Sequence, residues 1–289
     1  MIEQLLQQIF ESTIDSVTAV SGGDINNAYL VKLTNKEQCF VKHNSYADGD
    51  KMFATEAQGL NFLNSHSPFN IPKVIDCRSI EKHHFLLLDY IQTGSSSEAD
   101  FRTFGQRLAT MHQSTADRFG FDSDNFIGRL PQVNTQQSSW KDFYINHRLR
   151  YQLLLGERQG YFDTSAIKKL DKLSSIWDKL VPKEAPSLLH GDLWSGNYLS
   201  MSSGEITIID PAIYFGHREV DLAMTRLFGG FPSSFYEGYQ EVWPLEQGAE
   251  ERVKLYQLYP ILVHANLFGG HYTTQALQIL NSTDSYREL

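Results

Sequence analysis

The first third of the chain alternates short apolar runs with polar turns, a pattern typical of antiparallel strands. Turn residues at 35–37 precede an apolar run at 39–42, and residues 85–91 form a longer run that is apolar enough for a buried strand. Between these runs, residues 50–63 repeat apolar positions at helical spacing, on a stripe that contains Phe53, Ala57 and Leu60. The pattern predicts a small antiparallel sheet accompanied by one helix.

Beyond residue 91 the pattern becomes helical. The stretch 92–97 is rich in Gly and Ser, as expected of a linker, and apolar stripes at helical spacing then recur in residues 101–111, 143–153, 167–180 and 255–268, the last with a kink expected at Pro260. We therefore expect an α+β protein with two lobes, residues 1–91 and residues 92–289.

A polar stretch at residues 120–139 interrupts the helical region. It is rich in Asn, Gln, Ser and Gly and contains Pro131. Loops of this length inside a compact domain are often functional. We expect this stretch to be a loop.

A hairpin is predicted near residue 200. Tyr198 and Leu199 open an apolar run, the segment 202–204 (Ser-Ser-Gly) supplies turn residues, and a β-branched run at 206–209 ends at Asp210. Folding back brings Asn197 and Asp210 to the same end of the hairpin. An amide oxygen and a carboxylate there could share one hard cation, with Asp192 beside it.

The spacing of Asp192, Asn197 and Asp210 indicates a phosphotransferase. A kinase accepts a proton from a substrate hydroxyl with an Asp, and holds Mg²⁺ against ATP phosphates with an Asn five residues later and a second Asp downstream. The alternative is a polar strand-loop-strand with incidental carboxylates. The downstream Asp, placed directly after an apolar strand, argues against that alternative.

The upstream chain supplies the other parts that a kinase needs. Gly22 and Gly23 lie in a polar turn where backbone N–H groups could approach phosphate, although two glycines in a turn usually indicate only a hairpin. Lys42 ends a short strand and could reach the α- and β-phosphates, or could equally be an edge-strand lysine. Glu56 lies beside the apolar stripe of the predicted helix, where it can pair with Lys42 or be an ordinary surface residue.

A hinge is expected at the end of the strand at 85–91. Asp89, Tyr90 and Ile91 precede the linker, and adenine in such hinges is bound by backbone groups, here the carbonyl of Asp89 and the N–H of Ile91. The prediction depends on position, because side-chain identity matters little for backbone contacts.

Composition and charge exclude several classes of protein. The 289 residues include 25 Lys and Arg against 34 Asp and Glu, a net charge of −9 with no basic run longer than Lys168-Lys169, which argues against a nucleic-acid partner. No apolar run approaches the roughly 20 residues of a membrane span. The N-terminus lacks the pattern of a secretion signal, and Cys39 and Cys77 are expected to be reduced core thiols. These features predict a cytoplasmic protein.

Three segments resemble the fructosamine kinase (ketosamine 3-kinase) family. They are residues 189–197, residues 210–224 with the run Tyr214-Phe215-Gly216-His217-Arg218-Glu219, and residues 227–231. Related aminoglycoside and choline kinases usually carry His-Pro where this chain has Trp194-Ser195. The resemblance covers nearly the whole chain and implies a two-lobed, protein-kinase-like fold, use of ATP and Mg²⁺, and phosphorylation at O3 of sugar amines attached to proteins or lysine.

The resemblance also implies roles for single residues. Asp192 would accept the proton, Asn197 and Asp210 would bind Mg²⁺, and Lys42 would contact phosphate with Glu56 as its partner. Asp221 would anchor the catalytic loop by accepting backbone N–H bonds, with His190 packed beneath that loop.

Trp194, His217 and Arg218 are candidates for recognition of the sugar amine. The indole could equally be a core residue, and His217 could equally be structural. Two further functions stay open at this stage: a kinase for another hydroxylated amine, of the aminoglycoside or choline type, and a catalytically inactive nucleotide-binding module.

Overall fold

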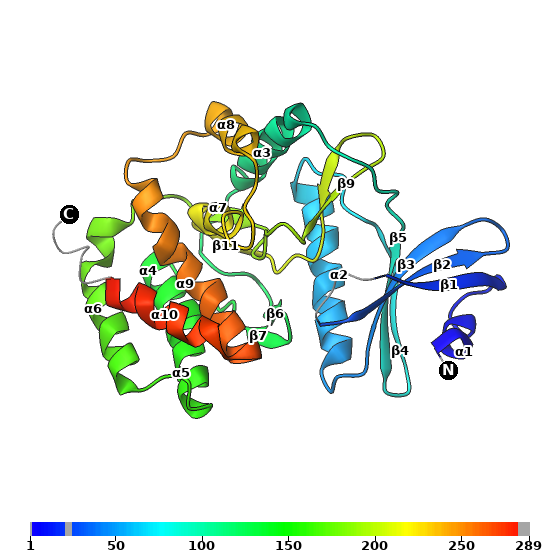
Figure 1. Ribbon diagram of the computed structural model, residues 1–289, viewed down its shortest axis with the longest axis horizontal. Helices are drawn as coiled ribbons and strands as arrows, with labels where there is room; N and C mark the ends of the chain where they lie inside the picture. Colours follow the sequence, from blue (N-terminus) through cyan, green and yellow to red (C-terminus); the bar gives the residue numbers. More distant parts are fainter. Residues whose placement is uncertain (1, 21–24, 283–289) are drawn as a thin grey trace.

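The computed structural model describes residues 2–20 and 25–282 of the chain. A five-stranded sheet with two helices forms the N-terminal lobe, and a mainly helical lobe follows it (Figure 1). The predicted α+β architecture is therefore confirmed. Gly22 and Gly23 of the predicted phosphate-binding turn lie outside the described residues.

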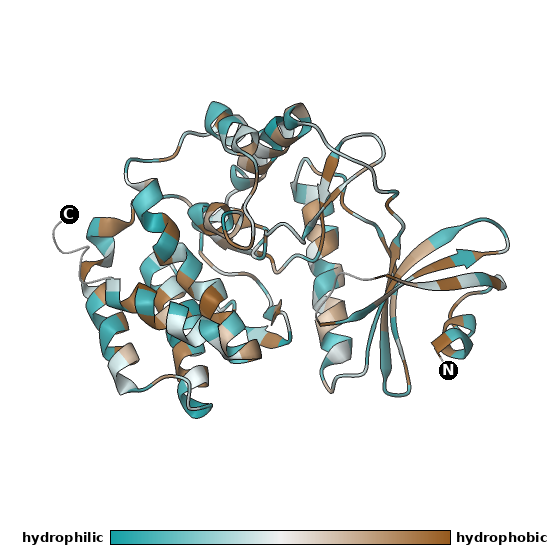
Figure 2. Ribbon diagram, in the orientation of Figure 1, coloured by the Kyte–Doolittle hydropathy of each residue, from teal (hydrophilic) through white to brown (hydrophobic). Residues whose placement is uncertain are grey.

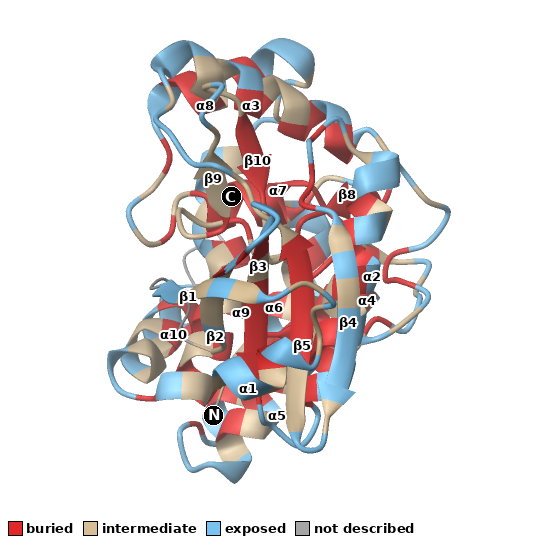
Figure 3. Ribbon diagram, turned by 90° about the vertical axis from the view of Figure 1, so that its right-hand side faces the viewer, coloured by how far each residue is buried: buried red, intermediate tan, exposed pale blue. Residues whose placement is uncertain are grey.

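The sheet of the N-terminal lobe is antiparallel throughout, in the order β1-β2-β3-β5-β4. Its strands are β1 (Ile14–Val20), β2 (Asn27–Leu33), β3 (Gln38–Asn44), β4 (Val74–Ile80) and β5 (His83–Asp89). Of its three inner strands, β3 and β5 are the most buried, whereas the edge strand β4 is largely exposed (Figure 3).

Both faces of the sheet are covered. Because side chains alternate along a strand, Phe85 and Leu87 of β5 pack in a small core with Leu6 of α1 (Ile2–Gln7), while Leu86 and Leu88 face the opposite side. That second side carries α2 (Gly49–His66), the helix predicted from residues 50–63, which stands between the sheet and the C-terminal lobe (Figure 1). The core on this side continues into the helical lobe.

The linker between the lobes pairs with the predicted hairpin. Gly94 N–H donates to Ser200 C=O at 2.8 Å, and Ser202 N–H donates to Gln92 C=O at 2.8 Å. The linker ends at a capping box, in which Ser97 accepts from Asp100 N–H and Asp100 accepts from Ser97 N–H, so the next helix begins at Glu98.

The C-terminal lobe packs helices whose hydrophobic and hydrophilic positions alternate (Figure 2). They are α3 (Glu98–His112), α4 (Trp140–Phe143), α5 (Tyr151–Arg158), α6 (Thr164–Leu180), α7 (Glu219–Met224), α8 (Ser233–Val242), α9 (Ala249–Phe268) and α10 (His271–Ser282). A π-helix, η1 (Tyr144–Arg150), joins α4 to α5. None of the helices in the described ranges is both long and apolar enough to cross a membrane.

Helix α9 continues through Pro260. Proline has no N–H to donate to the carbonyl four residues earlier, that of Tyr256. The phenol of Tyr144 donates to this carbonyl instead, at 3.2 Å. A side chain from η1 therefore replaces the missing helical hydrogen bond.

Three two-stranded ladders complete the lobe. The predicted hairpin is confirmed as β9 (Tyr198–Ser200) with β10 (Ile206–Ile208), and β8 (Ser187–Leu189) pairs with β11 (Tyr214–Gly216). The stretch 120–139, predicted as a loop, contains a short hairpin of β6 (Asn125–Ile127) and β7 (Leu130–Gln132).

The two cysteines differ from the prediction in one respect. Cys39 is buried in β3, as expected for a core thiol, but Cys77 on the edge strand β4 is exposed. Asp76 and Arg78 flank Cys77 in the sequence, and an edge strand of this kind leaves part of its surface uncovered.

Candidate active site

A cavity of about 500 Å³ lies where the two lobes meet. Its lining from the N-terminal lobe includes Lys42 and Glu56, and its lining from the C-terminal lobe includes Asp192, Asn197 and Asp210. The residues that the sequence singles out as phosphotransferase residues thus converge on one space.

Lys42 connects the two lobes at this cavity. Its Nζ lies 2.7 Å from Oε1 of Glu56 on α2 and 3.0 Å from Oδ1 of Asp210. Burial opposes a charged lysine, yet Asp210 and Glu56 together raise the pKa of Lys42 above its usual value. Burial raises the pKa of Glu56 to about 7 against the pull of Lys42, because two carboxylates share this one cation.

Asp221 on α7 holds the loop that carries Asp192. Its two carboxylate oxygens accept the backbone N–H groups of His190 and Gly191, at 2.7 and 2.9 Å. His112 lies 3.2 Å from the same carboxylate. Burial alone would raise the pKa of Asp221, but the contacts with His112, the charge of His190 and the Gly191 amide hold it below its usual value.

The side chain of His190 also holds the loop that carries Asp192. The ring Nε2 of His190 lies 2.9 Å from Ile209 C=O, directly before Asp210, and the Nδ1 accepts from Asp192 N–H at 3.2 Å. Next to it, Gly191 has a φ of +83°, and a Cβ built there would lie only 2.1 Å from Ala212 O. This position requires glycine both for its backbone conformation and for the close approach.

Asn197 is hydrogen-bonded directly to Asp192. The amide Nδ2 of Asn197 donates to the backbone oxygen of Asp192 at 2.8 Å and to its carboxylate at 3.0 Å. Burial, followed by repulsion from Asp210, raises the pKa of Asp192 to about 7, although the bond from Asn197 opposes the shift. A carboxyl group with this pKa can accept a proton close to neutral pH.

The residues at the end of the β9–β10 hairpin fit a divalent cation. The two hydrogen bonds from Asn197 to Asp192 both use its Nδ2, so the amide oxygen of Asn197 is the atom that can bind a metal. Ile209 N–H donates to Asn197 C=O at 3.0 Å, which brings Asp210 alongside. Amide and carboxylate oxygens are the ligands that Mg²⁺ prefers. Among the described residues, the carboxylates of Glu56 and Asp210 both pair with the one cation of Lys42.

The predicted hinge also borders the cavity. Asp89, Tyr90 and Ile91 belong to its lining. The carboxylate of Asp89 accepts the N–H of Lys73, so the end of β5 is held to the segment that precedes β4. Apolar side chains from both lobes line the cavity as well: Val20, Ala28, Phe40, Leu88, Leu199 and Ile209.

The three candidates for substrate recognition separate in the structure. Trp194 lines the cavity and packs edge-on against Phe228, with ring centroids 5.9 Å apart. His217 and Arg218 are buried and do not belong to the cavity lining. The structure therefore places His217 and Arg218 away from the cavity, and of the three candidates Trp194 is the one that lines it.

The guanidinium of Arg218 has a structural set of partners. It donates to Glu184 at 2.9 Å and to the carbonyls of Trp243 and Pro244, both at 2.8 Å, and it lies 4.0 Å from the centroid of the Trp243 ring. These bonds fix the segment between α8 and α9. The sequence suggested a binding role for Arg218 because charged residues are usually exposed. The sequence pattern did not show that this arginine is buried.

Several lining residues had no signal of their own in the sequence. Asn125 and Phe126 come from the β6–β7 hairpin, and Tyr259, Val263 and Leu267 come from α9. The unusual length and polarity of residues 120–139 suggested that this segment is functional, but did not single out Asn125 or Phe126 within it. The helical spacing of α9 predicted a core-facing stripe, which does not distinguish the wall of a cavity from a filled core.

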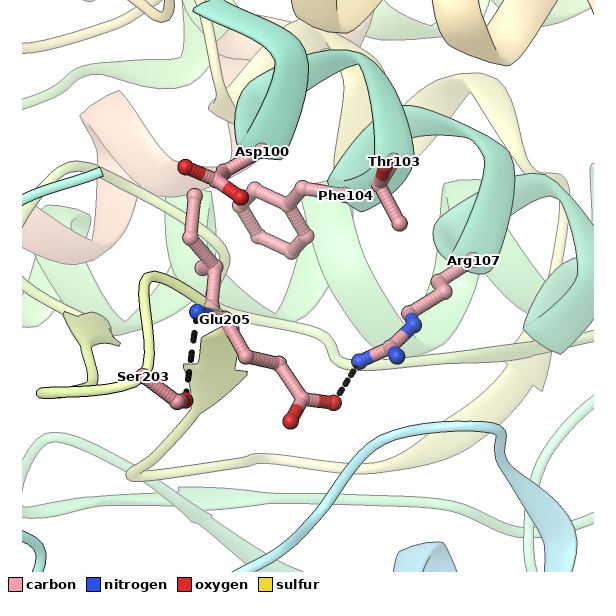
Figure 4. A pocket seen from close by; sticks show the side chains of 7 residues that line it. Asp100, Thr103, Phe104, Arg107, Ser203 and Glu205 are labelled. Atoms are coloured by element: carbon pink, nitrogen blue, oxygen red, sulfur yellow. Dashed lines mark hydrogen bonds and ion pairs between the residues drawn. The ribbon is translucent and has the colours of Figure 1, made fainter. Parts of the chain in front are cut away.

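A second, smaller pocket of about 260 Å³ lies between α3 and the turn of the β9–β10 hairpin (Figure 4). Figure 4 shows the ion pair between Arg107 and Glu205 inside it. It shares none of its lining residues with the larger cavity. The phosphotransferase residues named above lie only in the larger one.

Comparisons with known proteins agree with this geometry. The family model described as fructosamine kinase matches residues 1–285. A Synechocystis protein named as a ketoamine kinase is 41% identical over 285 residues, covering 96% of this chain and 95% of its own. The chloroplastic protein-ribulosamine 3-kinase of Oryza sativa subsp. japonica is 38% identical over 276 residues, covering 93% of this chain and 78% of its own.

A crystal structure gives the same result for the fold. The protein from Haemophilus somnus 129PT, assigned as a fructosamine-3-kinase, superimposes with a TM-score of 0.85 at 30% identity. The match covers 98% of this chain and 96% of the other.

Proposed function

This chain belongs to the fructosamine kinase family, and we propose that it transfers the γ-phosphoryl group of ATP to the C3 hydroxyl of a ketoamine, an amine adduct derived from fructose or ribulose. The observation that carries the proposal is the contact of Lys42 with both Glu56 and Asp210 at the cavity where Asp192 and Asn197 also lie. Cytoplasmic localisation remains a prediction from the sequence.

In the proposed mechanism Asp192 accepts the proton of the attacking C3 hydroxyl. The half-buried carboxylate has a pKa of about 7, so it can take up the proton as the oxygen attacks phosphorus. Lys42 contacts the phosphates and is held in place by Glu56. The backbone of Asp89 and Ile91 binds adenine.

Asn197 and Asp210 would hold Mg²⁺ in this proposal. When bound, the ion neutralises charge on the phosphates of ATP. Asn197 also orients Asp192 through the bonds from its amide nitrogen, so one side chain serves both the base and the metal.

The lining of the cavity argues against an aminoglycoside as the acceptor. Within the described part of the chain, its carboxylates are Glu56, Asp89, Asp192 and Asp210, and each is already placed at the phosphates, the hinge or the base. A polycationic acceptor would need further acidic residues. The wall formed by α9 is instead mostly apolar, with Val263 and Leu267 among its residues.

The function is tested by incubating the protein with ATP·Mg²⁺ and either fructosyllysine or ribulosyllysine. We expect formation of ADP and a product whose phosphate is located at C3 by phosphorus NMR. Kanamycin and choline serve as alternative acceptors in parallel reactions. Turnover confined to one of these, or a phosphate on another hydroxyl, would overturn the substrate proposal while leaving the kinase intact.

The role of Asp192 is tested by Asp192→Asn. Since a positioned base contributes typically about 10²- to 10⁴-fold, kcat should fall by about 10²-fold or more while the affinity for nucleotide stays near that of the wild type. The exposed Asp117→Asn is the matched control and should leave kcat unchanged. Wild-type turnover by the Asp192→Asn protein would show that another group accepts the proton.

A further inference from the structure

The β6–β7 hairpin and the residues directly after it contribute three buried amide side chains, Asn125, Gln132 and Asn134, which are 8%, 1% and 0% exposed. Burying an amide is costly unless its polar atoms are hydrogen-bonded. The partners of these amides include the backbone that follows Asp210, although about 80 residues separate the two segments in the sequence.

Gln132 stands at the centre of this group. Its Nε2 donates to Oδ1 of Asn125 at 2.8 Å and to the backbone oxygen of Ala212 at 3.1 Å. Its Oε1 accepts the phenol of Tyr259 at 2.6 Å. One side chain therefore joins the hairpin to α9 and to the segment just after Asp210.

The Ala212 peptide links the two segments that carry the acidic residues of the site, Asp192 and Asp210. Its N–H donates to the backbone oxygen of His190 at 2.9 Å, two residues before Asp192. Its carbonyl, two residues after Asp210, is the atom against which Gly191 packs. A shift of the Ala212 peptide would therefore move both carboxylates relative to each other.

The hairpin holds this peptide from a second point. Asn125 Nδ2 donates to the backbone oxygen of Ile213 at 2.9 Å, and Asn134 Nδ2 donates to Asn125 Oδ1 at 3.1 Å. Asn134 is in turn fixed by Arg148 of the π-helix, whose guanidinium donates to its Oδ1 at 2.6 Å. The segment after Asp210 is thus anchored by a chain of buried hydrogen bonds that begins in η1.

We propose that Gln132 is a positioning residue for phosphoryl transfer, which sets the distance between Asp192 and Asp210 through the Ala212 peptide. The proposal rests on the function proposed above for these two carboxylates. It gives the polar stretch 120–139 a role in the reaction, in addition to its place in the wall of the cavity. Gln132 itself acts through the backbone and contacts no reacting atom.

The test compares Gln132→Met with wild type. Methionine matches the length of glutamine but cannot donate to Ala212 or accept from Tyr259. We expect kcat with the ketoamine to fall about tenfold or more, since misplacing a reacting group by about 1 Å can cost 10²-fold, while the KM for ATP changes by less than about twofold. The exposed Gln136→Met is the matched control and should retain wild-type kcat.

Two further variants separate positioning from general stability. Tyr259→Phe removes one bond of Gln132 but leaves its bond to Ala212, so kcat should fall by less than about threefold. Gln132→Glu keeps the size and the acceptor for Tyr259, but its buried carboxyl group has at most one O–H donor where the amide has two N–H donors. It cannot donate to both Asn125 and Ala212, so it should also lower kcat. If Gln132→Met does not fold, Gln132→Glu decides the question.

Slow hydrolysis of ATP by water, measured without any acceptor, distinguishes this proposal from the proposed function. If wild type phosphorylates no ketoamine, the substrate assignment fails, and the loss of ATP hydrolysis in the Gln132 variants still tests positioning. Equal kcat per folded molecule in wild type and the Gln132 variants, with only a lower melting temperature, would overturn the proposal.

Discussion

The raised pKa of Asp192 should affect the pH dependence of folding stability as well as catalysis. Its pKa is raised from 3.8 to about 7, with burial as the main cause. Between these two values the folded chain binds more protons than the unfolded chain. The contribution of Asp192 to stability is therefore favourable at low pH and is lost as the pH rises through about 7.

At this residue scale, Asp192→Asn should stabilise the chain at alkaline pH. The neutral amide avoids the cost of ionising a half-buried carboxyl group, so in the absence of divalent cations the free energy of unfolding should increase at about pH 8, by at most about 4 kcal/mol. Urea unfolding in the presence of a chelator measures this difference. It should shrink as the pH approaches 4, and a variant that is less stable than wild type at about pH 8 would contradict the argument.

Helices α9 and η1 depend on each other at the scale of elements. The carbonyl of Tyr256 is left without a helical donor by Pro260, and the phenol of Tyr144 donates to it. Tyr144 is fully buried, so water cannot replace its hydroxyl easily. The π-helical turn therefore supports a helix that also forms one wall of the cavity.

We expect Tyr144→Phe to lower the free energy of unfolding by about 1–3 kcal/mol, the cost of leaving a buried acceptor unpaired. In a Pro260→Ala background the alanine N–H restores the helical bond, so the same substitution should cost clearly less. Denaturant unfolding of the four proteins forms a double-mutant cycle. Equal losses in both backgrounds would show that the phenol contributes in another way.

Elements could be predicted better than their connections. The stripe at Phe53, Ala57 and Leu60 predicted α2, and turn residues before a β-branched run predicted the β9–β10 hairpin, because both signals are local in sequence. The π-helix and the β6–β7 hairpin were not predicted, since their residues pack against elements far away in the chain. The same reason explains why Gln132 and Tyr259 carried no signal.

On the scale of the whole molecule, one hydrophobic core spans both lobes. It contains Leu60 and Leu86 from the N-terminal lobe together with Leu189 and Ile208 from the C-terminal lobe. Backbone hydrogen bonds between the linker and the β9–β10 hairpin reinforce this continuity. The two lobes are therefore expected to unfold together, although the site lies between them.

Calorimetry should show a single unfolding transition. Leu60→Ala, at a position only 1% exposed, should destabilise that one transition by about 2–5 kcal/mol, the usual range for a buried leucine. The exposed Leu154→Ala is the matched control, and its effect should be small. Two separable transitions, only one of which responds to Leu60→Ala, would indicate lobes that fold independently.

The burial of Lys42 should protect it from the reducing sugars that form ketoamines. Reducing sugars attack amines in their unprotonated form, and Lys42 is kept protonated by its two carboxylate partners and is only 6% exposed. After prolonged incubation with ribose, mass spectrometry should find adducts on exposed amines such as Lys51 and an unmodified Lys42. A kinase that acts on sugar-modified amines would thereby keep the amine proposed to contact its phosphates from being modified in the same way.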